Sequence, residues 1–277
     1  MSKWVLDEID YAESGRGPTI VLVPGSCSTG AAWRPVMSIW NQQFHCVTTS
    51  LLGYGQTVET RSQVDRSILH ETDMLESVIR RTGKPVHLVG HSFGGLVALA
   101  VALRNRVQLS SLVVIEPPAV GLLPERGELK HYEAFRRMTS AYFAAYQSGD
   151  VAAIEGMIDF YGGVGTFAAW PDRVRAYAVD TTSVNILDWA SAYGFELSAA
   201  SLAAIQVPAL VLWGEASDPA MQRIGALLVE SINHGTSAMV DGAAHFMIAT
   251  HATEVACFIA EHVRRVESRH RCHDLLV

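Results

Sequence analysis

The sequence predicts an α/β fold: a mostly parallel central sheet with helices on both faces and an inserted helical cap. Two observations predict it. Short apolar runs rich in β-branched residues alternate along the 277-residue chain with longer stretches of helical periodicity, which is the pattern of βαβ units. The alternation stops between about residues 119 and 204, where the pattern is helical throughout.

In chain order, the expected strands are Thr19–Val23, Phe44–Thr49, Pro85–Val89, Leu112–Ile115, Ala209–Trp213 and a weaker one at Ser237–Val240. The clearest helical stretches are Asp65–Arg81, Phe93–Leu103, Met221–Ile232 and Thr253–Val266. We therefore expect residues 1–118 and 205–277 to form the α/β core and residues 119–204 to form the cap. Parallel sheets carry their sites at the carboxyl ends of their strands, so the cap should cover the site.

The predicted cap is rich in aromatic residues and holds 13 of the 23 in the chain. Most of them should pack the cap onto the core, because buried aromatic side chains are usually structural. A minority should line a pocket. The candidates for that lining are Tyr142, Tyr146, Trp170 and Trp189 of the cap, together with two residues of the core, Trp33 and Phe246.

Composition excludes several classes of protein. Apolar residues make up 49% of the chain and charged residues 18%, which predicts a large core and argues against disorder. The net charge of −7 argues against a partner of nucleic acid. No apolar run approaches the ~20 residues of a membrane span, and no signal peptide is recognisable. The four scattered cysteines contain no CxxC pair. We expect a cytoplasmic protein with reduced thiols, no membrane association and no metal site.

The decisive segment is GHSFGG at residues 90–95. It follows an expected strand and leads into a helix of small residues, so its G-x-S-x-G pattern stands in a strand–turn–helix context. We call this turn the elbow and the helix that follows it the elbow helix. The turn is so tight that side chains at positions 90 and 94 would collide with neighbouring backbone, which glycine avoids. Such a turn exposes the hydroxyl of Ser92 and places the N–H of Phe93 at a helix N-terminus.

With these features the sequence resembles the α/β-hydrolase superfamily over nearly its whole length. The resemblance implies a triad in the order nucleophile, acid, histidine, with Ser92 as the nucleophile. The segment DGAAHF at residues 241–246 resembles the late G-x-x-H loop of that family and makes His245 the base. His91, next to the nucleophile, should point away from the hydroxyl and be structural.

Two carboxylates compete for the third place in the triad. Asp218 follows a strand where many family members carry the acid, and Glu116 follows the strand after the elbow helix, where a sizeable minority carry it. Asp218 lies four residues after Gly214, where three is more usual, and Pro219 begins a helix at once. We favour Glu116 and keep Asp218 as the alternative, with Glu215 as a weaker third.

The resemblance also implies an oxyanion hole built from two backbone N–H groups. One belongs to Phe93, and we assign the other to Ser26, in the loop Val23-Pro24-Gly25-Ser26-Cys27. Most relatives have His-Gly in this loop, so Pro24 is a departure. Gly25 still allows close approach of the backbone.

Serine at position 92 argues against haloalkane dehalogenases and epoxide hydrolases, because those relatives use an aspartate at the elbow. It favours acyl transfer with no cofactor. The aromatic cap predicts an enclosed apolar pocket, and therefore a small ester or lactone as substrate. The alternatives are a C–C bond hydrolase of a ring-cleavage dienoate, a cofactor-free perhydrolase or haloperoxidase, and a ligand-binding receptor. A dienoate would need a basic side chain in the pocket, for which the candidates are Arg136, Arg137 and Arg173. The oligomeric state, monomer or homodimer, is left open.

Overall fold

The computed structural model describes residues 8–274, and the side chains of residues 8–269. One seven-stranded sheet runs through it in the order β1-β3-β2-β4-β5-β6-β7. The strand bounds are β1 Tyr11–Ser14, β2 Thr19–Val23, β3 His45–Thr49, β4 Val86–His91, β5 Leu109–Ile115, β6 Ala209–Gly214 and β7 Gly235–Val240. Strand β1 is antiparallel to β3, and all the other pairs are parallel.

Helices connect the parallel strands, as crossovers require. Those of the core are η2 Gly30–Trp33, α1 Arg34–Trp40, α2 Leu69–Arg81, α3 Phe93–Arg104, α11 Pro219–Ser231, α12 Met247–Thr250 and α13 Ala252–Asp274. Between β5 and β6 lie α4 Leu122–Glu125, α5 Leu129–Gln147, α6 Ile154–Gly162, α7 Thr166–Ala169, α8 Asp172–Asp180, α9 Thr182–Gly194 and α10 Ala199–Leu202. We call residues 119–204, which contain this second group, the cap insertion.

Helices cover both faces of the sheet, so both are buried. Successive side chains along a strand point to opposite faces, and each set packs into a different apolar cluster. In β2, Val21 and Val23 belong to one apolar cluster, which also takes in residues of α2, α3 and α11. Ile20 and Leu22 belong to the other cluster, with residues of α1 and α13. This two-sided burial explains why the central strands read as continuous apolar runs.

The six strands expected from the sequence are present, Thr19–Val23 with the expected bounds and the others with ends shifted by at most three residues, and the fold class is confirmed. Strand β1 was missed, because its sequence YAES is polar and mostly exposed at the edge of the sheet. The helix expected to end at Val266 continues to Asp274 as α13. The polar sequence after Val266 gave no buried-face pattern by which to predict that extension.

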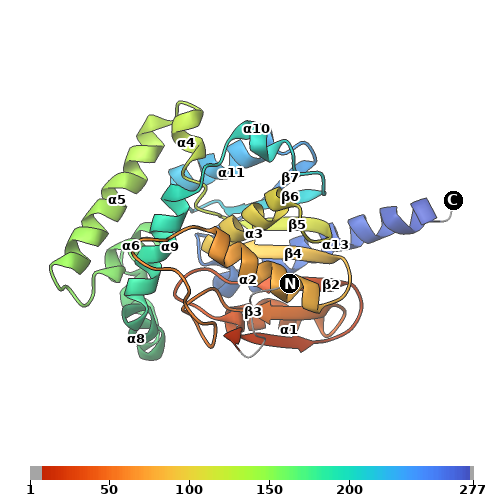
Figure 1. Ribbon diagram of the computed structural model, residues 1–277, viewed down its shortest axis with the longest axis horizontal. Coiled ribbons are helices and arrows are strands. Elements are labelled where there is room, and N and C mark those ends of the chain that lie inside the picture. The colour runs from red at the N-terminus through yellow and green to blue at the C-terminus, as the bar shows by residue number, and fades with distance from the viewer. Residues whose placement is uncertain (1–7, 275–277) are drawn as a thin grey trace.

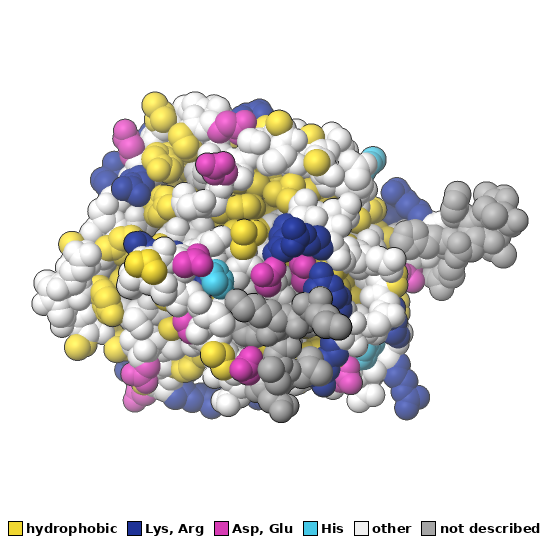
Figure 2. Space-filling model, viewed as in Figure 1, with side chains coloured by type: hydrophobic (Ala, Val, Ile, Leu, Met, Phe, Trp, Pro, Cys, Tyr) yellow, Lys and Arg dark blue, Asp and Glu magenta, His cyan; other side chains and the backbone are white. Residues whose placement is uncertain are grey.

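Helices α5, α6, α8 and α9 of the cap insertion lie at one end of the sheet, whereas α10 lies beside α11, and α13 projects from the opposite side of the molecule (Figure 1). Figure 2 shows acidic and basic side chains interspersed over one face of the described residues. Within residues 8–274, none of the helices combines the length and the apolar character needed to cross a membrane.

Candidate active site

Ser92 occupies a sharp turn between β4 and α3. Its backbone has φ 53° and ψ −129°, a region that non-glycine residues rarely adopt and that is held only by its surroundings. Glycine is required on both sides for steric reasons. A Cβ on Gly90 would lie 2.3 Å from the carbonyl oxygen of Gly94, and a Cβ on Gly94 would lie 2.2 Å from that of Pro24. The two glycines thus hold the elbow in the tight form expected from the sequence.

The Ser92 hydroxyl is hydrogen-bonded to His245, and His245 in turn to Glu116. The distances are 2.9 Å from Oγ of Ser92 to Nε2 of His245 and 2.7 Å from Nδ1 of His245 to Oε2 of Glu116. A carboxylate can only accept, so Nδ1 carries the proton and Nε2 accepts from the serine hydroxyl. His245 and Glu116 are each 2% exposed, so the imidazole contacts almost no bulk water.

Glu116 lies at the carboxyl end of β5, with φ 45°. Its second oxygen, Oε1, accepts hydrogen bonds from the backbone N–H of Gly214, at 2.8 Å, and from the Ser217 hydroxyl. Burial opposes ionisation of this carboxyl, but the hydrogen bonds and the nearby His245 outweigh it and hold the pKa of Glu116 below its ordinary value. The carboxylate is therefore charged and fixed in orientation, as an orienting acid needs to be.

The two other carboxylates considered from the sequence have different partners. Asp218 is the N-cap of α11, where Oδ1 accepts from the backbone N–H of Ala220 at 2.8 Å. Glu215 accepts from the backbone N–H of Gly242 at 2.8 Å. Their hydrogen bonds support the local backbone, and only Glu116 contacts His245 among the three.

The loop expected to supply the second oxyanion donor contacts the elbow. A Cβ on Gly25 would come within 2.8 Å of Cβ of Ser92, so the chain between β2 and η2 passes directly against the serine. Phe93 is the first residue of α3, and the first N–H groups of a helix have no partner within it. Ser26 donates its side-chain hydroxyl to Oδ2 of Asp188 at 2.6 Å, which anchors this loop to α9.

His91 points away from the Ser92 hydroxyl, as expected. Its Nε2 donates to the backbone carbonyl of His245 at 2.8 Å. Burial, and then the neighbouring His245, lower the pKa of His91 to about 3, so its ring is neutral at physiological pH. His91 therefore supports the loop that carries His245.

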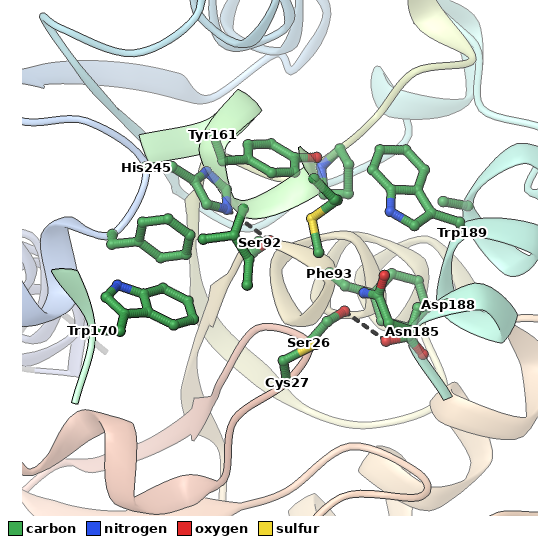
Figure 3. Close-up of a pocket in the computed structure, with 15 residues that line it drawn as sticks. Ser26, Cys27, Ser92, Phe93, Tyr161, Trp170, Asn185, Asp188, Trp189 and His245 are labelled. Carbon is green, nitrogen blue, oxygen red and sulfur yellow. Dashed lines mark hydrogen bonds between the residues drawn. The ribbon is translucent and has the colours of Figure 1, made fainter. Parts of the chain in front are cut away.

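A narrow cavity opens onto Ser92 beneath the cap insertion (Figure 3). Its volume is about 40 Å³. Its polar lining residues are Ser26, Cys27, Ser92, Asn185, Asp188 and His245; its apolar and aromatic ones are Phe93, Pro118, Met157, Ile158, Tyr161, Trp170, Trp189, Ala192 and Phe246.

Three of the six expected pocket residues, Trp170, Trp189 and Phe246, line this cavity. The other three do not. Trp33 is fully buried in the apolar cluster with α1 and α13. Tyr142 is 3% exposed, with its hydroxyl on the backbone carbonyl of Thr182, and Tyr146 is exposed to solvent. The prediction that Trp33 lines the site was wrong, because its side chain packs with residues of α1 and α13 and does not reach the cavity.

Eight residues of the cavity lining were not singled out from the sequence as site residues, and three of them, Tyr161, Asn185 and Asp188, bear directly on the site. Tyr161 stacks on the imidazole of His245, with ring centroids 4.1 Å apart. Asn185 and Asp188 lie one turn apart on α9 and are each 2% exposed. Their i, i+3 spacing within an otherwise apolar stretch was the available signal, since it places two polar groups on one helix face. The stacking of Tyr161 had no sequence signal, because it depends on how the cap insertion is placed.

Asp188 is the centre of a buried polar network. Its Oδ2 accepts from Ser26 and, at 2.7 Å, from the Tyr54 hydroxyl; its Oδ1 accepts from Nη1 of Arg61 at 2.7 Å. Arg61 also pairs with Glu59 and Glu71. Burial raises the pKa of Asp188, although Arg61 opposes the shift. The network joins the cap insertion to the loop that follows β2.

The cavity lining contains no lysine or arginine among the described residues. Arg136, Arg137 and Arg173, the candidates for holding a substrate carboxylate, are all exposed. The guanidinium of Arg61, which pairs with the lining residue Asp188, is occupied by its three acidic partners. Over the part of the chain that the structure describes, no group of three or more metal-ligating side chains is placed to hold an ion. His270, Cys272 and His273, which the sequence offers only as a weak metal-site candidate near its C-terminal end, lie outside the described side chains.

A family model described as "Alpha/beta hydrolase family" matches residues 20–256. The chain belongs to the alpha/beta hydrolase family. That assignment confirms the resemblance seen in the sequence, and a hydrolase is the enzyme class it supports.

Individual relatives are distant. The chain is 22% identical over 246 residues to the (E)-2-((N-methylformamido)methylene)succinate hydrolase of Acinetobacter baylyi, covering 87% of this chain and 88% of that one. It is 29% identical over 109 residues to the pimeloyl-[acyl-carrier protein] methyl ester esterase of Vibrio atlanticus, covering 39% and 40% of the two chains. The structure of MenH from S. aureus superposes with a TM-score of 0.73 at 18% identity, covering 93% of this chain and 99% of that one, which shows the shared fold.

Proposed function

We propose that this protein hydrolyses small carboxylic esters or lactones through an acyl-enzyme formed on Ser92. The observation that carries the proposal is the unbroken series of hydrogen bonds from Ser92 through His245 to Glu116. A serine hydroxyl needs a base to become a nucleophile, and the base needs an acid that fixes its tautomer and stabilises its charged form. Membership of a family with named esterases supports the same reaction class.

In the proposed mechanism, Oγ of Ser92 attacks the substrate carbonyl carbon while Nε2 of His245 takes the hydroxyl proton. The carbonyl oxygen becomes an oxyanion, which accepts hydrogen bonds from the backbone N–H groups of Phe93 and Ser26. The tetrahedral intermediate then expels the alcohol, and His245 returns the proton to its oxygen. Water attacks the acyl-enzyme in the same manner, so the products are the free acid and the restored serine.

The cavity supports a small substrate. Its open space is narrow, and most of its lining is apolar or aromatic, which favours a short acyl group over a long chain. The absence of a cation from the described lining removes the feature that would favour a dienoate carboxylate. An ester, which is uncharged, has no need of one.

The test is hydrolysis of p-nitrophenyl esters from acetyl to octanoyl, beside a folded Ser92→Ala control. We expect turnover to peak at short acyl chains and to disappear in Ser92→Ala. No turnover above that control would contradict the proposal, and dienoate substrates would then be tried. A ligand-induced rise in melting temperature without product would indicate a receptor instead.

A further inference from the structure

One polar atom of the cavity has no partner. Oδ1 of Asn185 is fully buried and accepts no hydrogen bond from any described residue, although Asn185 lines the cavity. Buried polar groups are nearly always paired, because leaving a buried acceptor without a donor costs stability. Such an atom in an active-site cavity is therefore a candidate for pairing with a ligand.

The neighbouring polar groups are already used. Both oxygens of Asp188 are occupied by Ser26, Tyr54 and Arg61. Because the carboxylate is paired with a buried guanidinium, it does not offer a free charge to a substrate. The acceptor of Asn185 is consequently the one unpaired, fully buried side-chain acceptor among the described residues of the lining.

The position of Asn185 relative to Ser92 indicates which part of a substrate it would meet. In Figure 3, Asn185 and Asp188 lie on one side of Ser92, and His245 and Trp170 lie on the other. The leaving group must lie on the side of His245, since that imidazole protonates it. The acyl group then extends toward Asn185 and α9.

We propose that Asn185 is a specificity-determining residue that accepts a hydrogen bond from a hydroxyl or amide N–H on the acyl group of the substrate. The preferred substrates are thus hydroxyacyl or amidoacyl esters or lactones. This inference rests on the proposed function, since it assumes that the acyl carbon is attacked by Ser92. A site built to pair a substrate donor rejects an analogue that lacks the donor, because the buried acceptor is then left unpaired.

The experiment compares matched p-nitrophenyl esters in the wild type and in Asn185→Leu, a variant of similar volume without the acceptor. The pairs are 3-hydroxybutanoyl with 3-methoxybutanoyl and N-acetylglycyl with N-acetylsarcosyl, in which methylation removes the donor. We expect kcat/KM of the wild type to favour the donor ester by about tenfold, the size of one neutral hydrogen bond. The intrinsic reactivity of each ester cancels when this ratio is compared between variants.

In Asn185→Leu the preference should fall to about onefold, while Asn185→Asp, which keeps an acceptor, should retain it. Ser183→Leu is the matched control, because Ser183 is exposed on the same helix; it should leave the preference unchanged. Equal preferences in the wild type and Asn185→Leu would overturn the proposal. The 3-oxobutanoyl ester has only an acceptor at the position of the 3-hydroxyl group. A wild-type preference for it over the 3-hydroxybutanoyl ester would also overturn the proposal.

A binding measurement separates this inference from the proposed function. Calorimetry compares acetamidomethylboronic acid with its N-methyl analogue, since boron accepts a serine oxygen without any need for turnover. About tenfold tighter binding of the N–H compound, lost in Asn185→Leu, would support the inference even if no ester were hydrolysed. Binding without that difference, or no binding of either compound, would count against it. Ester turnover that is abolished in Ser92→Ala but shows no donor preference would sink only the role of Asn185.

Discussion

The phenol ring of Tyr161 lies against the imidazole of His245, with centroids 4.1 Å apart and ring planes inclined by 26°. Tyr161 belongs to α6 of the cap insertion and is 5% exposed, whereas His245 follows β7 in the core. On the edge of the imidazole, Glu116 and Ser92 fix the two nitrogens. Tyr161 therefore restrains the one direction, perpendicular to the ring, that hydrogen bonds do not.

We expect Tyr161→Leu to lower kcat about tenfold with a smaller change in KM, because a loosened imidazole is less often aligned with Ser92. Tyr161→Phe keeps the ring and should stay within about twofold of the wild type. Steady-state kinetics on one short ester checks both variants. A loss of the same size in Tyr161→Phe would show that the hydroxyl, and not the stacked ring, is what matters.

The choice of acid has a direct test in two isosteric variants. Glu116→Gln keeps the shape but cannot hold His245 in the required tautomer, so we expect kcat to fall by about 1,000- to 10,000-fold. Asp218→Asn leaves an efficient helix cap on α11, and we expect activity within about twofold of the wild type. Turnover of a single ester under saturation measures both. The reverse order of losses would assign the acid to Asp218.

Much of this site could be predicted from the sequence, because the elbow and the late histidine loop are local patterns. Gly90, Ser92 and Gly94 are close in the chain, and their steric reason is contained in one turn. The acid could be narrowed only to alternatives, since Glu116 and Asp218 both follow strands and their distances from His245 depend on the sheet. The fold of the core was also predictable from local patterns. Because both faces of the sheet are buried, β2, β4 and β5 have mostly apolar sequences that are visible without the structure.

The cap insertion shows where sequence patterns end. Its helices were expected. The prediction of which aromatic side chains face the cavity was right for Trp170 and Trp189 but wrong for Tyr142 and Tyr146. On an isolated helix, a residue that packs against a neighbouring helix and one that lines a cavity have the same apolar periodicity. Only the placement of α5, α6 and α9 over the sheet distinguishes them.

The buried network predicts a dependence of stability on pH. Burial raises the pKa of Glu71 to about 8, from an ordinary value of 4.5, although Arg61 opposes the shift. Folding therefore favours the protonated carboxyl; this contribution to the free energy of unfolding is complete below about pH 4.5 and is lost as the pH rises through about 8.

Because Glu71→Gln resembles the protonated form at every pH, we expect it to gain stability relative to the wild type between pH 5 and pH 9. Urea unfolding at pH 5, 7 and 9 measures the difference. Glu261→Gln, at an exposed position on α13, serves as control and should show no such trend. A difference for Glu71→Gln that stays constant over this range would contradict a raised pKa.

Among the members of the buried network, we expect substitution of Arg61 to lower the free energy of unfolding most. Its side chain is fully buried, and it pairs with Asp188, Glu59 and Glu71. Arg61→Met leaves these acids without their cation, and we expect the free energy of unfolding to fall by about 3–5 kcal/mol. Chemical unfolding checks the prediction. Arg175→Met, which breaks an exposed ion pair with Asp172, should change it by less than about 1 kcal/mol.

Strands β4 and β5 are neighbours in the sheet, and the backbone N–H of Ser92 donates to the carbonyl of Ile115, the residue before Glu116, at 2.8 Å. Ser92 and Glu116 therefore come from a single βαβ unit that is complete before the chain enters residues 119–204. Asp218 follows residues 119–204, so every change in the length of that segment would alter its distance along the chain from Ser92, which is not so for Glu116. The helices of the cap insertion can therefore differ in number and length without altering the separation of Ser92 and Glu116 along the chain.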